Sequence, residues 1–70
     1  MLEAFGREQR SEGLAQGRAE AILAVLASRA LAPSAHEQDQ ILRERDPARL
    51  ARWLARAASC TSVAELLAIP

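Results

Sequence analysis

The apolar residues of the chain recur with helical spacing most clearly between residues 13 and 31. At 100° per residue they fill an arc of roughly 200° around a helix, which is too wide for one neighbouring element to cover. The pattern therefore predicts a long helix with two surfaces to bury, and we expect later segments of the chain to fold back on this arc. The arc contains Leu14, Ala15, Ala19, Ala21, Ile22, Leu23, Val25 and Leu26.

A stripe of mostly small residues lies outside that arc. Its positions follow alternating three- and four-residue steps, which is the heptad spacing of a seam between two helices. Small side chains would let a partner backbone approach closely, so the stripe predicts self-association. The alternative is that its glycines are relics of a degenerate linker repeat. The positions are Gly6, Gly13, Gly17, Glu20, Ala24, Ala27 and Leu31.

Residues 1–12 are polar apart from three positions, and no proline interrupts them. This arm could continue the long helix or fray, because each glycine in a helix interior costs about 1 kcal/mol relative to alanine. Phe5 has no apolar cluster beside it in the arm, which favours contact with another chain. The interface that we expect therefore consists of Phe5, Gly13, Gly17, Ala24 and Leu31.

The second half of the chain predicts three short helices, over residues 35–44, 47–58 and 63–68. Pro33 ends the long helix, and Ser34 with Glu37 fits the capping-box pattern that begins a new one. Asp46 followed by proline is a typical helix start, and Ser62 with Glu65 repeats the capping-box pattern. We find no alternating β-branched run that would predict a strand.

The predicted fold is therefore all-α, with one long N-terminal helix followed by three short helices, assembled as a helical oligomer. Residues 13–70 would form this helical oligomerisation domain. Trp53 should be the largest anchor of its small core. The expected core residues are Ile22, Val25, Leu26, Ile41, Leu42, Leu50, Trp53, Leu54, Val63, Leu66 and Leu67.

The composition supports an assembly more than an enzyme. A chain of 70 residues has a thin core, and its single cysteine, Cys60, excludes an internal disulfide, so oligomerisation is the remaining usual remedy. Nine arginines balance nine acidic residues and there is no lysine, which gives no electrostatic case for nucleic acid or an anionic membrane. The longest apolar run, residues 21–27, is too short to span a bilayer. We expect a soluble, cytoplasmic bacterial protein.

Few residues are candidates for chemistry. Arg45, Arg49, Arg52 and Arg56 lie within roughly 60° on one side of the third predicted helix, and the choice is between a phosphate-binding stripe and a solvated face. His36 and Cys60 are far apart in sequence and make no metal cluster. We predict no catalytic residue, no metal and no cofactor.

Three segments together resemble a known tail. Residues 12–20 read EGLAQGRAE, residues 50–57 read LARWLARA and residues 61–67 read TSVAELL. This arrangement resembles the C-terminal helical tail of the PD-(D/E)XK nuclease, transposase-like family, the recombination-promoting nucleases. The family's catalytic acidic and lysine residues cannot be carried over, because the chain has no lysine and no predicted strand to hold them.

The resemblance implies a module that multimerises the nuclease. A free tail could be an internally initiated short product or an engineered fragment. The function that we expect is a non-enzymatic, self-associating module, a dimer or a dimer of dimers, that binds and inhibits a related full-length nuclease in the manner of an antitoxin. The alternatives are a passive multimerisation tail and a small nucleic-acid-binding module that uses the arginines.

Overall fold

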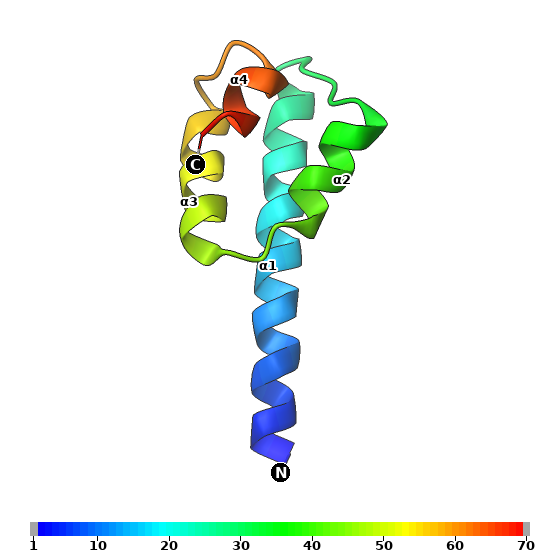
Figure 1. Ribbon diagram of the computed structural model, residues 1–70, viewed down its shortest axis with the longest axis vertical. Helices are drawn as coiled ribbons and strands as arrows, with labels where there is room; N and C mark the ends of the chain where they lie inside the picture. Colours follow the sequence, from blue (N-terminus) through cyan, green and yellow to red (C-terminus); the bar gives the residue numbers. More distant parts are fainter. Residues whose placement is uncertain (1, 70) are drawn as a thin grey trace.

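The computed structural model describes the backbone of residues 2–69 and the side chains of residues 13–69. The four helices are α1 (Leu2–Ser28), α2 (Ala35–Arg43), α3 (Pro47–Ala57) and α4 (Val63–Leu67). No strand occurs between residues 2 and 69, so the all-α prediction is confirmed. The molecule measures 45 × 20 × 19 Å, and its long axis follows α1 (Figure 1).

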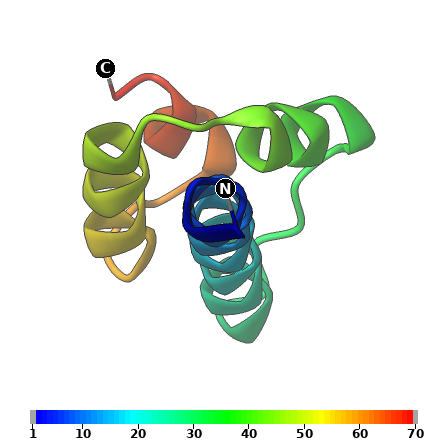
Figure 2. The ribbon, with the colours of Figure 1, turned by 90° about the horizontal axis from the view of Figure 1, so that it is seen from below.

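The three short helices surround only part of α1. Helices α2 and α3 lie on either side of its C-terminal half, α4 lies above the gap between them, and the N-terminal half of α1 extends beyond all three (Figure 1). Seen along α1, the short helices occupy one side and leave the opposite side open (Figure 2). The fold therefore divides α1 into a covered inner face and an uncovered outer face.

The inner face of α1 is the base of the core. Ala15, Ala19, Ile22 and Leu26 follow helical spacing and are buried, and α2 and α3 are the helices that contact α1. Trp53 of α3 is fully buried and is the largest residue in the core. Truncation of such a side chain to alanine typically costs about 3–5 kcal/mol, which is a large share of the stability of a small domain.

The expected core residues divide into two groups. Seven are buried, namely Ile22, Leu26, Ile41, Leu50, Trp53, Val63 and Leu66. Four are half-buried and pack against them, namely Val25, Leu42, Leu54 and Leu67. Three residues outside that expected set, Ala19, Ala57 and Cys60, are fully buried as well.

Two of the three short helices begin with the caps that their sequences predict. The Ser34 hydroxyl accepts a hydrogen bond from the Glu37 N–H, and the Glu37 carboxylate accepts one from the Ser34 N–H, which completes a capping box. The Asp46 carboxylate accepts from the Ala48 N–H at 3.1 Å, with Pro47 at the first helical position.

The cap of α4 is only half of the predicted box. The Ser62 hydroxyl accepts from the Glu65 N–H at 3.1 Å. The Glu65 carboxylate does not return to the Ser62 N–H; it accepts hydrogen bonds from Thr61 instead. The predicted ends of α2, α3 and α4 each lie one residue beyond the observed ones.

Helix α1 ends at Ser28, three residues before the predicted end. Ala30 adopts a left-handed backbone with φ 59°. Its N–H donates to the Ala27 carbonyl at 3.0 Å, and the Leu31 N–H donates to the Leu26 carbonyl at 2.9 Å. These two bonds form a Schellman motif, in which glycine is the usual residue at the left-handed position. The Schellman motif therefore ends α1 upstream of Pro33, the residue that we expected to end it.

Replacing Ala30 with glycine should stabilise the fold. A non-glycine residue in the left-handed conformation costs roughly 1–2 kcal/mol, which glycine would avoid. Glycine also has more conformational freedom in the unfolded chain, and this offsets part of the stabilisation. We expect Ala30→Gly to raise the free energy of unfolding by about 0.5–1 kcal/mol in urea titrations at fixed protein concentration. Ala32→Gly, in the same connection, should give no gain. Equal effects of the two substitutions would contradict this account of the helix end.

Candidate interaction surface

The outer face of α1 carries the predicted stripe of small residues. Gly13, Gly17 and Ala24 are exposed, as are Glu20 and Ala27 between and beyond them. These positions lie on the side of the helix opposite to the buried Ala19 and its neighbours, because they differ from them by about half a helical turn. The short helices of the same chain therefore leave this stripe uncovered.

Neither glycine is required by packing within the chain. A Cβ atom built on Gly13 or on Gly17 meets no atom within 4 Å. Each glycine in a helix interior nevertheless costs about 1 kcal/mol relative to alanine. The fold of the single chain gives no compensation for that cost.

The prediction that the short helices cover the whole apolar arc of α1 is wrong at Leu14. We expected the short helices to cover the whole arc, but Leu14 is 60% exposed and is the exposed large apolar residue among residues 13–69. The reason is the position of the short helices, which reach only the C-terminal half of α1 (Figure 1). Leu14 lies on the border between the covered face and the glycine stripe.

Two of the predicted interface residues do not belong to the described stripe. Leu31 lies beyond the end of α1 and is half-buried against the core, because the Schellman turn directs it inward. Phe5 lies outside the residues whose side chains the structure describes. The part of the predicted interface that forms one surface consists of Gly13, Gly17 and Ala24.

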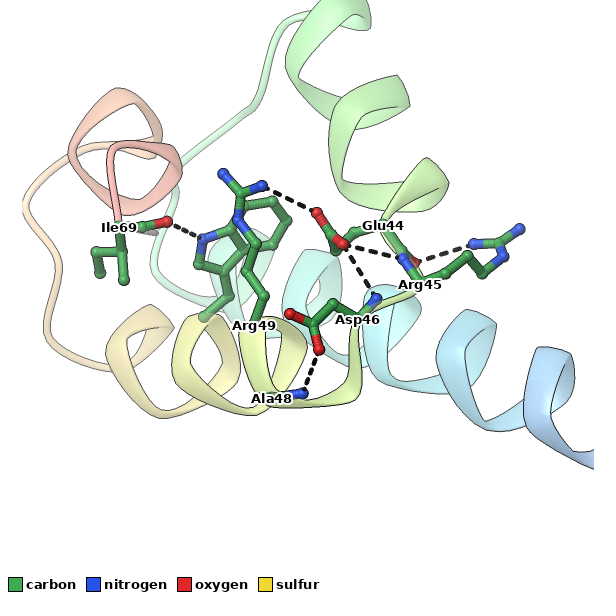
Figure 3. Close-up of polar contacts among 7 residues, drawn as sticks. Glu44, Arg45, Asp46, Ala48, Arg49 and Ile69 are labelled. Carbon is green, nitrogen blue, oxygen red and sulfur yellow. Dashed lines mark hydrogen bonds and ion pairs between the residues drawn. The ribbon is translucent and has the colours of Figure 1, made fainter.

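The corner between α2 and α3 is organised around one carboxylate (Figure 3). One oxygen of Glu44 accepts hydrogen bonds from the N–H groups of Arg45 and Asp46, at 3.1 and 3.0 Å. The other accepts from the Arg49 guanidinium at 3.1 Å. This carboxylate therefore joins the end of α2 to the first turns of α3.

Arg49 also rests on the core tryptophan. Its guanidinium lies 4.6 Å from the centre of the Trp53 ring, which is a cation–π contact. The indole N–H of Trp53 donates to the Ile69 carbonyl at 3.1 Å and so holds the last described residue of the chain against α3 (Figure 3). Arg49 is thus part of the packing of α3.

The other arginines of the predicted phosphate-binding stripe also have partners within the chain. The Arg45 guanidinium donates to the Leu42 carbonyl at 2.7 Å, and Arg56 lies 3.6 Å from the Glu65 carboxylate. Together with Arg49, these contacts spread the guanidinium groups over α2, α3 and α4. A stripe aimed at one phosphate backbone would instead need them to point outward together.

Sequence reasoning did not single out Arg29, which joins α1 to α3. Its guanidinium donates to the Ala57 carbonyl at 2.7 Å and to the Cys60 sulfur at 3.5 Å. A cation at this position stabilises the C-terminal end of α3, because the last carbonyls of a helix lack partners within it. The only signal in the sequence is a basic residue near the predicted end of α1, and nothing there says which helix it serves.

Glu65 is the one acidic residue among those described whose ionisation is clearly shifted. The hydroxyl and the N–H of Thr61 both donate to its carboxylate and lower its pKa from the ordinary 4.5, with smaller contributions from Arg56 and Arg29. Desolvation opposes the shift and has a larger effect on this pKa than either arginine. The residue lies at the surface, so its effect is local.

The remaining polar groups form no reactive arrangement within residues 13–69. His36 is exposed on α2, in an open hollow that also includes Asp39 and Arg43, and those two form an ion pair of 2.9 Å. Cys60 is fully buried. No three histidine, cysteine or acidic side chains of the described part come together as metal ligands. In the same part of the chain, no helix has the length and apolar character needed to cross a bilayer.

Comparison of the chain with protein-family models, with characterised proteins and with solved structures finds no match.

The Glu65 contacts predict a pH dependence. A carboxylate with a lowered pKa in the folded chain stabilises the fold above its unfolded pKa, and this contribution disappears as the pH falls through the folded value. The difference in stability between the wild type and Glu65→Gln should therefore be largest well above pH 4.5 and should shrink below it. Urea titrations over this range measure it.

Thr61→Val is the matched control, because it removes the hydroxyl donor and leaves the charge. We expect this variant to lose part of the same pH dependence. Parallel loss of stability in the wild type and Glu65→Gln at all pH values would contradict the assignment.

Proposed function

We propose that the chain is a non-enzymatic interaction module that associates with itself through the outer face of α1. The observation that carries the proposal is the exposed stripe of Gly13, Gly17 and Ala24, for which the single chain supplies no packing reason. A second helix lying along the stripe would approach closely and gain contacts that offset the cost of the glycines.

The distribution of the core supports the same conclusion. Among the side chains described, the buried positions of α1 extend from Ala15 to Leu26, and the N-terminal half of the helix extends beyond the three short helices (Figure 1). A helical segment without tertiary contacts is marginally stable in water. Association along α1 would supply the contacts that the small core lacks.

The arginines support the alternative of nucleic-acid binding less well. Arg45, Arg49 and Arg56 already donate to carbonyls or pair with carboxylates of the chain. Binding to a phosphate backbone would have to replace these contacts, and the net charge of zero adds no long-range attraction.

Gly17→Leu separates association from folding. The space around Gly17 is open and leucine is the better helix former, so the monomer should keep its helical content. A leucine in the stripe should prevent the close approach of a second helix. Light scattering over a dilution series should show a mass of two or four chains for the wild type and a shift towards one chain for Gly17→Leu.

Arg18→Leu is the matched control, because Arg18 is exposed one position along the same helix and lies outside the stripe. It should keep the mass of the wild type. A monomeric wild type, or an unchanged mass for Gly17→Leu, would contradict self-association through the stripe.

The resemblance to a nuclease tail extends the proposal to a regulatory role. We propose that the free chain pairs with the corresponding tail of a full-length nuclease through the same face of α1 and holds that enzyme inactive. The support is the resemblance of residues 12–20, 50–57 and 61–67, together with the exposed stripe. A passive multimerisation tail would bind in the same way without inhibition.

The regulatory role requires a measurement with the enzyme. Adding the purified chain to a nuclease that carries such a tail should bind the enzyme and reduce DNA cleavage, and Gly17→Leu should do neither. Binding without loss of cleavage would indicate a passive tail, and no binding would end the regulatory proposal.

A further inference from the structure

We infer that residues 61–69 form a lid that opens as one unit and uncovers the indole ring of Trp53, while α1, α2 and α3 stay folded. The lid contains α4, and the short helices lie on the side of α1 opposite the glycine stripe (Figure 2). The inference is therefore independent of the self-association proposed above. Three features lead to it: the contacts between the helices, the point where the chain is anchored and the bonds of the lid.

The contacts between the helices place α4 at the edge of the fold. Helix α1 packs directly against α2 and α3, and α4 contacts α2 and α3. The Glu44 carboxylate adds a direct connection between the end of α2 and the first turns of α3. These contacts among α1, α2 and α3 do not involve α4, so they can persist when α4 moves away.

The chain is anchored to the core immediately before the lid. Cys60 is fully buried, and its N–H donates to the Arg56 carbonyl at 2.8 Å. The Arg29 guanidinium donates to the Cys60 sulfur at 3.5 Å. Thr61 and Ser62, which follow, are exposed and precede α4. The lid can therefore turn about these two residues without disturbing the end of α3.

The polar contacts that shape α4 do not hold it onto the core. The Ser62 hydroxyl caps α4 at the Glu65 N–H, and Thr61 donates to the Glu65 carboxylate, so both contacts lie within the lid. The ion pair between Arg56 and Glu65 connects the lid to α3 at 3.6 Å, but both side chains are about half exposed and such a pair adds little.

The lid is held by apolar burial and by its bond to the tryptophan. Val63 and Leu66 are buried, and Leu67 packs half-buried against the core. The indole N–H of Trp53 donates to the Ile69 carbonyl at 3.1 Å (Figure 3). A helix of five residues is unstable in water by itself, so α4 depends on this docking and unfolds when it is lost. Opening therefore breaks the indole bond and exposes the ring.

Hydrogen exchange at Trp53 tests the inference within one residue. It is the single tryptophan of the chain, so its indole N–H gives one NMR signal. The lid holds this N–H, whereas the backbone N–H of Trp53 lies inside α3. At fixed protein concentration, the indole N–H should be at least about 10-fold less protected, relative to the unfolded chain, than the backbone N–H. Its protection should match that of the Leu66 N–H in α4 to within about threefold.

The dependence on urea gives a second readout from the same protein. Opening of the lid exposes less surface than global unfolding. Urea far below the unfolding midpoint should therefore accelerate exchange of the indole N–H less steeply than exchange of the Trp53 backbone N–H.

Two helix caps provide matched variants. Ser62→Ala removes the cap of α4 and should accelerate exchange of the indole N–H about 5-fold. Asp46→Ala removes the cap of α3 and should accelerate exchange of the Trp53 backbone N–H by about the same factor. It should change exchange of the indole N–H by less than about twofold, because α3 stays folded in the open form.

Each outcome supports or overturns the lid. Equal protection of the two N–H groups of Trp53, or equal acceleration of both by Asp46→Ala, would mean that the chain opens only as a whole and would overturn it. An indole N–H that exchanges much faster than the Leu66 N–H would mean that the end of the chain frays alone, which also overturns it. Protection shared by the indole and α4, and insensitive to Asp46→Ala, supports the inference.

Discussion

Burial of the inner face of α1 is the interaction on which the rest of the structure depends. Ala15, Ala19, Ile22 and Leu26 form a buried stripe on α1, and α2 and α3 are the helices that contact α1. Trp53 fills the space between the helices and is held in turn by the Ile69 carbonyl and the Arg49 guanidinium.

The charged residues act as short ties between these elements. Glu44 joins α2 to α3, Arg29 joins α1 to the end of α3, and Glu65 joins α4 to the turn before it. Each of these contacts adds little to stability, because most of them lie at least partly in solvent.

The outer face of α1 obeys a different constraint from the inner one. On the inner face, Ala15 and Ala19 are buried in the core. On the outer face, Gly13 and Gly17 have no such contact in the chain, although they weaken the helix that carries them. These two glycines lower the stability of α1 in a domain whose core is small. This uncompensated cost is the physical basis for the proposed assembly.

What the sequence determined by itself is the set of features that act within one turn of a helix. The capping box at Ser34, the cap at Asp46 and the spacing that buries Leu50 and Trp53 could all be predicted, because each depends on residues at most four positions apart. The placement of Gly13, Gly17 and Ala24 on one face follows from the same local geometry.

The tertiary structure decided which surfaces those elements cover and which partners the charged groups choose. Leu14 is exposed because the short helices do not extend far enough along α1 to cover it. Leu31 is turned inward by the left-handed backbone of Ala30, which an alanine in the sequence does not predict. Arg29 and Glu65 bond to groups outside their expected helices. Long side chains select among partners in space, and only the packed arrangement of the helices brings those partners within reach.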